Sequence, residues 1–210
     1  MLFDEDPTYY TGSGIPKRML GVFLHEVKPQ NADQETLKTL LTELKKARAE
    51  DDNGFNTLLL LGNTGLGKTY MSQALANMVI HNAVFPENAA RYITHYELDM
   101  KLKSVMNSNY NGPGEYDLIS KYKMYGLLII DEFGRGSTSE FTMTKIEHIL
   151  TERMMRGKRT IIISNRKPDE LREFLDFQMQ DRFGIMEGGS RANDLCKTFL
   201  MGGKSLRGSL

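Results

Sequence analysis

Cysteine is almost absent from this chain of 210 residues, in which Cys196 is the only one. A single thiol excludes an intrachain disulfide and a metal site built from several cysteines, and it fits a reducing compartment. No apolar run approaches the roughly 20 residues that a membrane-spanning helix requires. The acidic start of the chain lacks the basic-then-apolar order of a signal peptide. We therefore expect a cytoplasmic protein that makes no use of a membrane.

The chain also lacks an excess of charge of either sign. Lysine plus arginine equals aspartate plus glutamate, at 27 each. This balance excludes a whole-molecule field that would attract nucleic acid, so any nucleic-acid site has to be a local patch. The four histidines do not have the spacing of metal ligands. Particular motifs therefore have to carry the function.

Short strand-like runs alternate with amphipathic segments along most of the chain. Strands are predicted at residues 58–61, 91–94, 127–130, 160–163 and 197–201, and helices over 37–47, 68–81, 97–106, 144–155 and 171–183. This alternation predicts an α/β fold with a central parallel sheet of about five strands and helices on both faces. Ligands of such sheets bind at the carboxyl ends of the strands.

The strongest motif begins where the strand at residues 58–61 ends. It reads G-x-x-x-x-G-K-T, the Walker A or P-loop pattern, and a predicted helix follows it. Its glycines allow a tight turn whose N–H groups point at phosphate oxygens, and the helix N-terminus adds positive potential. Lys68 is expected to reach the outer phosphates, and Thr69 to offer its hydroxyl to Mg²⁺. The predicted nucleotide-binding residues are Gly62, Asn63, Thr64, Gly65, Leu66, Gly67, Lys68, Thr69 and Tyr70.

Two adjacent carboxylates, Asp131 and Glu132, end the apolar strand at residues 127–130. This is the Walker B pattern with an additional glutamate. Asp131 is expected to hold Mg²⁺ through water, and Glu132 to activate the water that attacks the γ-phosphate. A small-molecule kinase needs no such glutamate, because it must exclude water. The pair therefore favours hydrolysis over transfer of the phosphoryl group to a metabolite.

Three further residues are candidates for sensing or stabilising the phosphates. Asn165 follows the strand at residues 160–163, and we expect it to hydrogen-bond the attacking water or the γ-phosphate. Arg182 is expected to act as an arginine finger on the nucleotide of a neighbouring subunit, and Arg207 to contact the nucleotide of its own subunit. A polar turn residue, a surface arginine and a solvated tail residue are the respective alternatives.

The order of these motifs is specific. Gly14-Ile15-Pro16-Lys17-Arg18 precedes Walker A, and Gly203-Lys204-Ser205-Leu206-Arg207 ends the series. Together they resemble the AAA+ ATPase module of the DnaC/DnaI helicase loaders and the related IstB transposition ATPases, over about residues 8–208. The resemblance implies a P-loop NTPase fold of AAA+ type, with ATP and Mg²⁺ as cofactors. It also implies ATP-dependent self-assembly and binding to single-stranded DNA and a DnaB-type replicative helicase.

The resemblance also shapes the expected domain organisation. Residues 1–32 are turn-rich and are expected to form an arm or linker, and residues 33–210 the AAA+ domain. We expect neither a large separate helical lid nor the N-terminal helicase-binding domain of bacterial loaders, which suggests a minimal, phage-type loader. The terminal motif also departs from the family's pattern, because Leu206 stands where a tyrosine is usual.

The function that the resemblance predicts is ATP-dependent helicase loading in DNA replication. Residues 97–123 correspond to the DNA-binding helices of the family. Basic and aromatic side chains there are candidates to contact phosphates and bases, namely Lys101, Lys103, Lys121 and Lys123 with Tyr92, Tyr96, Tyr110, Tyr122 and Tyr125. A second basic run, at residues 153–159, is interpreted as a solvated helix end, with Arg153 a candidate to face a neighbour's nucleotide. The alternatives are an IstB-like transposition helper acting on duplex DNA and a non-hydrolysing, nucleotide-gated docking scaffold.

Overall fold

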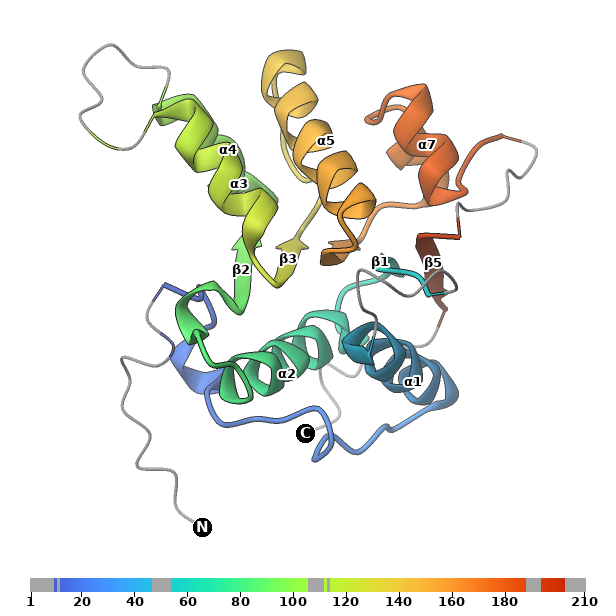
Figure 1. Ribbon diagram of the computed structural model, residues 1–210. Coiled ribbons are helices and arrows are strands. Elements are labelled where there is room, and N and C mark those ends of the chain that lie inside the picture. Colours follow the sequence, from blue (N-terminus) through green and yellow to red (C-terminus); the bar gives the residue numbers. More distant parts are fainter. Residues whose placement is uncertain are drawn as a thin grey trace.

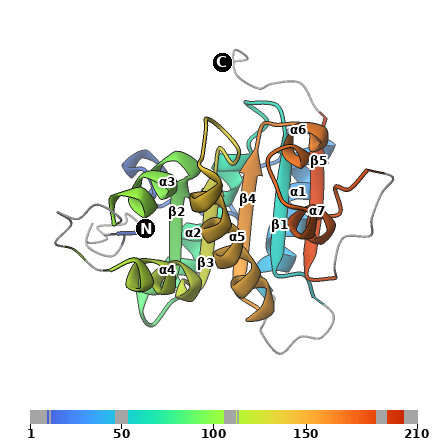
Figure 2. The ribbon, with the colours of Figure 1, turned by 90° about the horizontal axis from the view of Figure 1, so that it is seen from above.

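A parallel five-stranded sheet forms the centre of the protein (Figures 1 and 2). The computed structural model describes Tyr10, residues 12–46, 54–105, Gly112, residues 114–187 and 194–202. The sheet has the strand order β2-β3-β4-β1-β5, and every neighbouring pair is parallel. Its strands are β1 (Thr57–Gly62), β2 (Ala90–Thr94), β3 (Leu127–Asp131), β4 (Arg159–Ser164) and β5 (Cys196–Met201). The predicted α/β fold is confirmed.

Helices cover both faces of the sheet, as Figure 1 shows. One face carries α1 (Ala32–Lys46) and α2 (Lys68–His81). The other carries α3 (His95–Ser104), α4 (Glu115–Met124), α5 (Glu140–Met155), α6 (Pro168–Arg172) and α7 (Phe177–Phe183). Two short 3₁₀ helices, η2 (Lys17–Met19) and η3 (Pro86–Asn88), complete the described elements. No helix among the described residues is both long and apolar enough to span a bilayer.

The middle residues of the central strands are all apolar because both faces of the sheet are covered. Side chains alternate along β1, so Leu58 and Leu60 pack with α1 and α2, whereas Leu59 and Leu61 pack with the helices opposite. Every residue of β1 and β3 is buried. The sheet is therefore a rigid platform, and its strand ends hold the loops that follow them in fixed positions.

The predicted helix at residues 171–183 is wrong in its continuity. The structure has two short helices, α6 and α7, in this region. Asp176 interrupts the helical pattern because its carboxylate accepts a hydrogen bond from the N–H of Met179, at 2.7 Å, and so begins α7. Periodicity also gave no sign of α4, in which Tyr122 alone is buried. Only the family resemblance placed a second helix before β3.

The described part of the predicted arm packs against α1 and α2. Its apolar side chains belong to the same core cluster as the two helices, namely Tyr10, Ile15, Met19, Leu24 and Val27. The buried amide of Asn77 donates hydrogen bonds to the carbonyls of Met19 and Val22, at 2.5 and 2.8 Å. This segment thus forms part of the core and also borders the site described next.

Candidate nucleotide-binding and hydrolysis site

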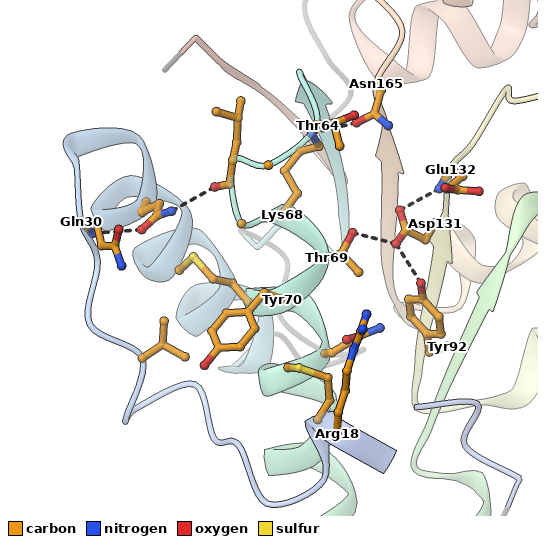
Figure 3. Close-up of a pocket in the computed structure, with 18 of the residues that line it drawn as sticks. Arg18, Gln30, Thr64, Lys68, Thr69, Tyr70, Tyr92, Asp131, Glu132 and Asn165 are labelled. Atoms are coloured by element: carbon orange, nitrogen blue, oxygen red, sulfur yellow. Dashed lines mark hydrogen bonds between the residues drawn. The ribbon is translucent and has the colours of Figure 1, made fainter. Parts of the chain in front are cut away.

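A cavity of about 820 Å³ opens where β1 and β3 end, against α2 and the arm (Figure 3). The loop from Gly62 to Thr69 links β1 to α2, and its residues from Thr64 onward line the cavity. Asp131, Glu132 and Asn165 face it from the ends of β3 and β4. The cavity therefore gathers residues from three loops that are distant in sequence.

The P-loop glycines adopt backbone conformations that other residues rarely take. Gly67 has φ of 90°, immediately before α2, and Gly62 has φ of 137°. A Cβ at Gly62 would lie 2.5 Å from the carbonyl oxygen of Met201 on β5. The loop is thus tightly packed against the last strand, and it ends in a helix N-terminus with an open positive end.

Gln34, on α1, hydrogen-bonds to the P-loop and helps to hold it in place. Its side chain is buried, its amide donates to the carbonyl of Leu66 at 3.1 Å, and its oxygen accepts from the N–H of Gln30 at 2.9 Å. Gln34 was not predicted as a site residue from the sequence. A polar residue on the apolar side of the helix, one turn before Leu37, was the available signal.

Lys68 lies inside the loop and is held by oxygen atoms. Its ammonium donates to the carbonyls of Gly62 and Asn63, at 2.6 and 2.7 Å, and to Oδ1 of Asn165 at 3.1 Å. Burial lowers the pKa of Lys68 to about 8, against the opposing effect of the Asp131 charge. Lys68 and Asn165, each predicted from its own motif, are therefore in direct contact, at the place where outer phosphates would arrive.

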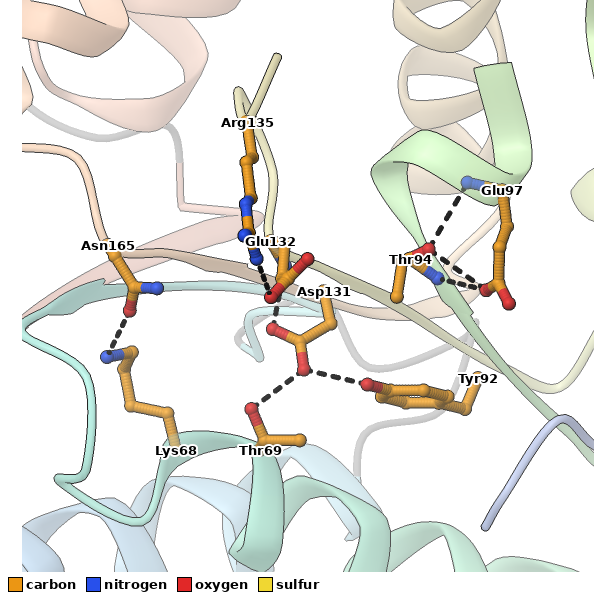
Figure 4. Close-up of polar contacts among 9 residues, drawn as sticks. All are labelled: Lys68, Thr69, Tyr92, Thr94, Glu97, Asp131, Glu132, Arg135 and Asn165. Atoms are coloured by element: carbon orange, nitrogen blue, oxygen red, sulfur yellow. Dashed lines mark hydrogen bonds and ion pairs between the residues drawn. The ribbon is translucent and has the colours of Figure 1, made fainter. Parts of the chain in front are cut away.

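The Asp131 carboxylate accepts three hydrogen bonds (Figure 4). Its Oδ2 accepts from the Thr69 hydroxyl at 2.7 Å and from the Tyr92 hydroxyl at 2.9 Å, and its Oδ1 accepts from the N–H of Glu132 at 2.7 Å. The side chains of Thr69 and Asp131 offer only oxygen atoms as ligands, and oxygen is the ligand atom that Mg²⁺ prefers. The residues present thus fit the metal.

Tyr92 was predicted as a residue for stacking on DNA bases, and that prediction is wrong. Its hydroxyl is directed at Asp131 and it lines the nucleotide cavity. Burial and the neighbouring Asp131 charge raise the pKa of Tyr92 well above its ordinary value, so its hydroxyl remains a donor at neutral pH. The sequence had no signal for this contact, because it depends on the pairing of β2 with β3.

Glu132 is the only non-glycine residue with a positive φ, at 54°, in the part of the chain that the structure describes. Such a conformation costs roughly 1 kcal/mol or more and needs support from its surroundings. The next residue supplies it, because the N–H of Phe133 donates to the carbonyl of Ile163 at 2.8 Å. The Glu132 carboxylate pairs with Arg135 at 2.5 Å. Glu132 is thus at the cavity but is engaged by a neighbouring cation.

Of the remaining predicted site residues, the structure describes Tyr70 and Arg182. Tyr70 lines the cavity with a partly exposed ring. Arg182, on α7, does not line the cavity, and its guanidinium donates to the Thr151 hydroxyl at 2.5 Å. Its role toward a neighbouring subunit stays a prediction. Arg207 falls outside the described residues.

The interpretation of residues 153–159 as a solvated helix end is wrong for Arg153. Its side chain has no exposed surface. The guanidinium donates to the carbonyls of Tyr122 and Tyr125, both at 2.8 Å, and to that of Arg159 at 2.6 Å. The carbonyls at the end of α4 need donors, and Arg153 supplies them. It therefore cannot face a neighbour's nucleotide.

The predicted DNA-contacting set also becomes smaller. Tyr122 and Tyr125 are buried against each other, so they cannot stack on bases. Lys103 pairs with Asp99 at 2.6 Å, and Lys123 lies 4.0 Å from Glu152. Tyr110 falls outside the described residues. Tyr96 on α3 is 64% exposed, and with Lys101 and Lys121 it remains a candidate.

Comparison with known proteins identifies relatives of this chain. A profile described as the bacterial DnaA ATPase domain matches residues 37–187. The chromosomal replication initiator protein DnaA of Mycoplasma pneumoniae is 28% identical over 132 residues, which are 63% of this chain and 29% of that protein. The same protein of Thermotoga petrophila is 32% identical over 131 residues, 61% of this chain and 28% of that protein. The chain thus spans less than a third of the length of these relatives.

Solved structures share the fold. AMPPCP-bound DnaA from Aquifex aeolicus has a TM-score of 0.69 and 18% identity, with 90% of this chain and 51% of that chain covered. DnaI has a TM-score of 0.60 and 22% identity, covering 80% and 84%. The DnaC helicase loader has 0.55 and 22%, covering 72% and 81%.

These likenesses confirm the predicted AAA+ fold, and the family profile covers more than half of the chain. The residues around Lys68 and Asp131 lie at the carboxyl ends of the parallel strands, where ligands of such folds bind. The chain belongs to the bacterial DnaA ATPase domain family and has the AAA+ fold of that family.

Proposed function

We propose that this protein binds and hydrolyses ATP to place a replicative helicase on single-stranded DNA during DNA replication. The convergence of Lys68, Asp131 and Glu132 on one cavity carries the ATPase part of the proposal. The support for the loading step is the fold shared with DnaC and DnaI, together with the replication initiators among the relatives.

The residues divide the work of hydrolysis by position. The P-loop N–H groups and Lys68 bind the β- and γ-phosphates, so the Lys68 ammonium exchanges carbonyl partners for phosphate oxygens. Asn165, already in contact with Lys68, orients the attacking water. Glu132 accepts a proton from that water as its oxygen bonds to the γ-phosphorus, while the bridging oxygen leaves with ADP.

Thr69 and Asp131 would hold Mg²⁺. The ion, when bound with ATP, neutralises charge on the phosphate oxygens. Thr69 already donates its hydroxyl proton to Asp131, so an oxygen lone pair of the hydroxyl remains available to a cation. Oxygen ligands from one hydroxyl and one carboxylate match the few protein ligands that Mg²⁺ takes beside phosphate.

ATP binding would also control assembly and DNA. In the proposal, Arg182 reaches the nucleotide of the next subunit, Arg207 senses the subunit's own nucleotide, and the assembled subunits present α3 and α4 to single-stranded DNA. Tyr96 would stack on a base, and Lys101 and Lys121 would contact phosphates. Hydrolysis would then release the DNA and the helicase.

Binding to labelled oligonucleotides and to a replicative helicase tests this function. Glu132→Gln protein with ATP should bind single-stranded DNA more tightly than duplex DNA of the same sequence, and should keep a replicative helicase bound in the complex. Tyr96→Ala should weaken the single-strand complex severalfold, since stacking contributes about 1–3 kcal/mol per base. Phe85→Ala, which removes an exposed aromatic ring outside α3 and α4, is the control. A strong duplex preference, or no helicase association with or without ATP, would contradict helicase loading.

A further inference from the structure

Tyr92 stands out among the cavity residues because the hydrolysis chemistry does not call for it. It is the middle residue of β2, the edge strand of the sheet beside β3. Its hydroxyl lies 2.9 Å from Oδ2 of Asp131, the same oxygen that accepts from Thr69 at 2.7 Å. One carboxylate oxygen is thus shared by the predicted metal-binding hydroxyl and by a tyrosine from a different strand.

We infer that Tyr92 is a positioning residue for the metal site, and that residues 12–14 of the N-terminal segment hold it in place. The inference rests on the proposed function, since it concerns the binding of Mg²⁺ with nucleotide. Tyr92 does not contact the phosphates in this account. Its hydroxyl and that of Thr69 reach the same oxygen of Asp131 from different elements, β2 and α2, as Figure 4 shows.

The other hydrogen bonds to the Asp131 carboxylate explain why the bond from Tyr92 matters. With the hydroxyl of Tyr92 removed, Oδ2 of Asp131 keeps Thr69, and Oδ1 keeps the N–H of Glu132. Thr69 lies in the first turn of α2, and the N–H of Glu132 belongs to the residue that follows β3. Tyr92 is the donor that comes from a strand, so it gives the carboxylate a reference fixed to the sheet.

The N-terminal segment fixes Tyr92 through its main chain. The N–H of Tyr92 donates to the carbonyl of Ser13 at 2.7 Å. The neighbouring Arg91 guanidinium donates to the carbonyl of Gly12. β2 is an edge strand, and the first of these contacts pairs one of its main-chain N–H groups, whereas the second uses a side chain.

Gly14 sets how closely the segment approaches. Its φ is 77°, and a Cβ there would lie 2.1 Å from the carbonyl oxygen of Tyr92. Any side chain at this position has to push the segment or the strand away. The glycine that opens the Gly14-Ile15-Pro16 motif is therefore required by the close approach to the residue that supports Asp131.

The test measures how nucleotide affinity responds to Mg²⁺, which needs no hydrolysis. Binding of a fluorescent ATP analogue is followed first in EDTA and then as Mg²⁺ is added, for wild-type protein and Tyr92→Phe. We expect the variant to bind the analogue in EDTA within about twofold of wild type, and to need about tenfold more Mg²⁺ for half of the response. Tenfold is the loss expected for one hydrogen bond to a charged acceptor.

Two glycine variants test the role of the N-terminal segment. Gly14→Ala should shift the Mg²⁺ response in the same direction as Tyr92→Phe. Gly21→Ala is the matched control, because Gly21 has the same φ of 77° but no atom within 4 Å of an added Cβ. Tyr125→Phe controls for loss of a tyrosine hydroxyl elsewhere in the core.

Several outcomes would overturn the inference. A folded Tyr92→Phe protein with the wild-type Mg²⁺ response removes the positioning role, and an equal loss of affinity in EDTA would make Tyr92 merely structural. If Gly14→Ala behaves as Gly21→Ala does, the N-terminal segment has no part in it. If wild-type protein binds no nucleotide at all, the proposed function itself fails, and the inference fails with it.

Discussion

Glu132 combines an unfavourable backbone conformation with an engaged side chain. Its φ of 54° is held by the bonding of Phe133 to β4, and its carboxylate pairs with Arg135, a largely exposed side chain. The Arg135 guanidinium occupies Oε1 of this carboxylate, so that oxygen is not open to an attacking water. The pair therefore has to open before Glu132 can accept a proton from water.

Arg135→Ala should accordingly raise the rate of ATP hydrolysis. An exposed ion pair contributes up to about 1 kcal/mol, so we expect an increase of up to about fivefold in kcat, with unchanged affinity for ATP. Steady-state hydrolysis measures both quantities. Arg156→Ala removes a comparable exposed pair with Glu152 and should change neither. A fall in kcat for Arg135→Ala would instead show that Arg135 assists the reaction.

Single residues also mark how far sequence could predict the site. Lys68, Thr69, Asp131 and Asn165 were predictable because their motifs are contiguous and each follows a strand. Tyr92 and Gln34 were not, because their contacts join segments far apart in the chain. Arg153 resembled an exposed cation in a basic run, and only the packing of α4 against α5 shows that it is buried.

At the scale of elements, the link between α4, α5 and β4 depends on Arg153. Its guanidinium binds carbonyls at the end of α4 and the hydroxyl of Thr160 on β4 at 3.0 Å. Burial lowers the pKa of Arg153. A buried cation without an acid beside it is stable here because carbonyl oxygens surround it.

Arg153→Met should destabilise the protein strongly, because several buried carbonyls would lose their donors. We expect the free energy of unfolding to fall by about 3–5 kcal/mol. Urea denaturation measures it. Arg156→Met, with an exposed side chain at the C-cap of the same helix, should change it by less than about 0.5 kcal/mol. Equal effects of the two substitutions would contradict the assigned role of Arg153.

The reactivity of Cys196 measures how firmly β5 is attached to the sheet, beside the P-loop. Burial raises the pKa of its thiol to about 12. The unfolded thiol has an ordinary pKa, so burial suppresses the reactive thiolate up to about pH 12. We expect alkylation at pH 8 to be at least about 100-fold slower in folded protein than in urea, and slower still with bound nucleotide. Labelling at the unfolded rate would show that β5 is detached from β1.

The bounds of a helix were predicted well where a motif and apolar periodicity both marked them. α2 was predicted to the residue, because the P-loop fixes its start and apolar residues mark its length. α6 and α7 were predicted as one helix, since the apolar spacing continues across Asp176 and only the capping contact divides them. Local patterns therefore indicate where apolar faces lie but do not show where a side chain competes for the backbone.

At the scale of the whole molecule, the proposed switch requires an assembly of several subunits. The cavity holds Lys68, Thr69, Asp131 and Glu132 from one chain, and no arginine beyond Arg18 lines it among the described residues. Transition-state charge on a transferred phosphoryl group is commonly stabilised by an arginine supplied in trans. Arg182, outside the cavity, is our candidate for that role.

Arg182→Ala should bind ATP normally and lose hydrolysis by about 1,000-fold, the lower value for an arginine finger. Mixing it with Lys68→Ala protein should restore part of the activity, because the second variant offers Arg182 to nucleotide bound by the first. Hydrolysis is measured against protein concentration. Arg172→Ala is the matched control on the adjacent helix α6. Normal hydrolysis by Arg182→Ala alone would exclude this arginine as the finger.

The central claim is that the cavity around Lys68 and Asp131 binds ATP and that Glu132 drives its hydrolysis. Its most direct test records ATP binding and single-turnover hydrolysis on the same samples of wild type, Lys68→Ala and Glu132→Gln, with Mg²⁺ and single-stranded DNA present. Wild type should bind and hydrolyse, Glu132→Gln should bind without hydrolysing, and Lys68→Ala should do neither. Normal ATP binding by Lys68→Ala, or hydrolysis at the wild-type rate by Glu132→Gln, would contradict the account.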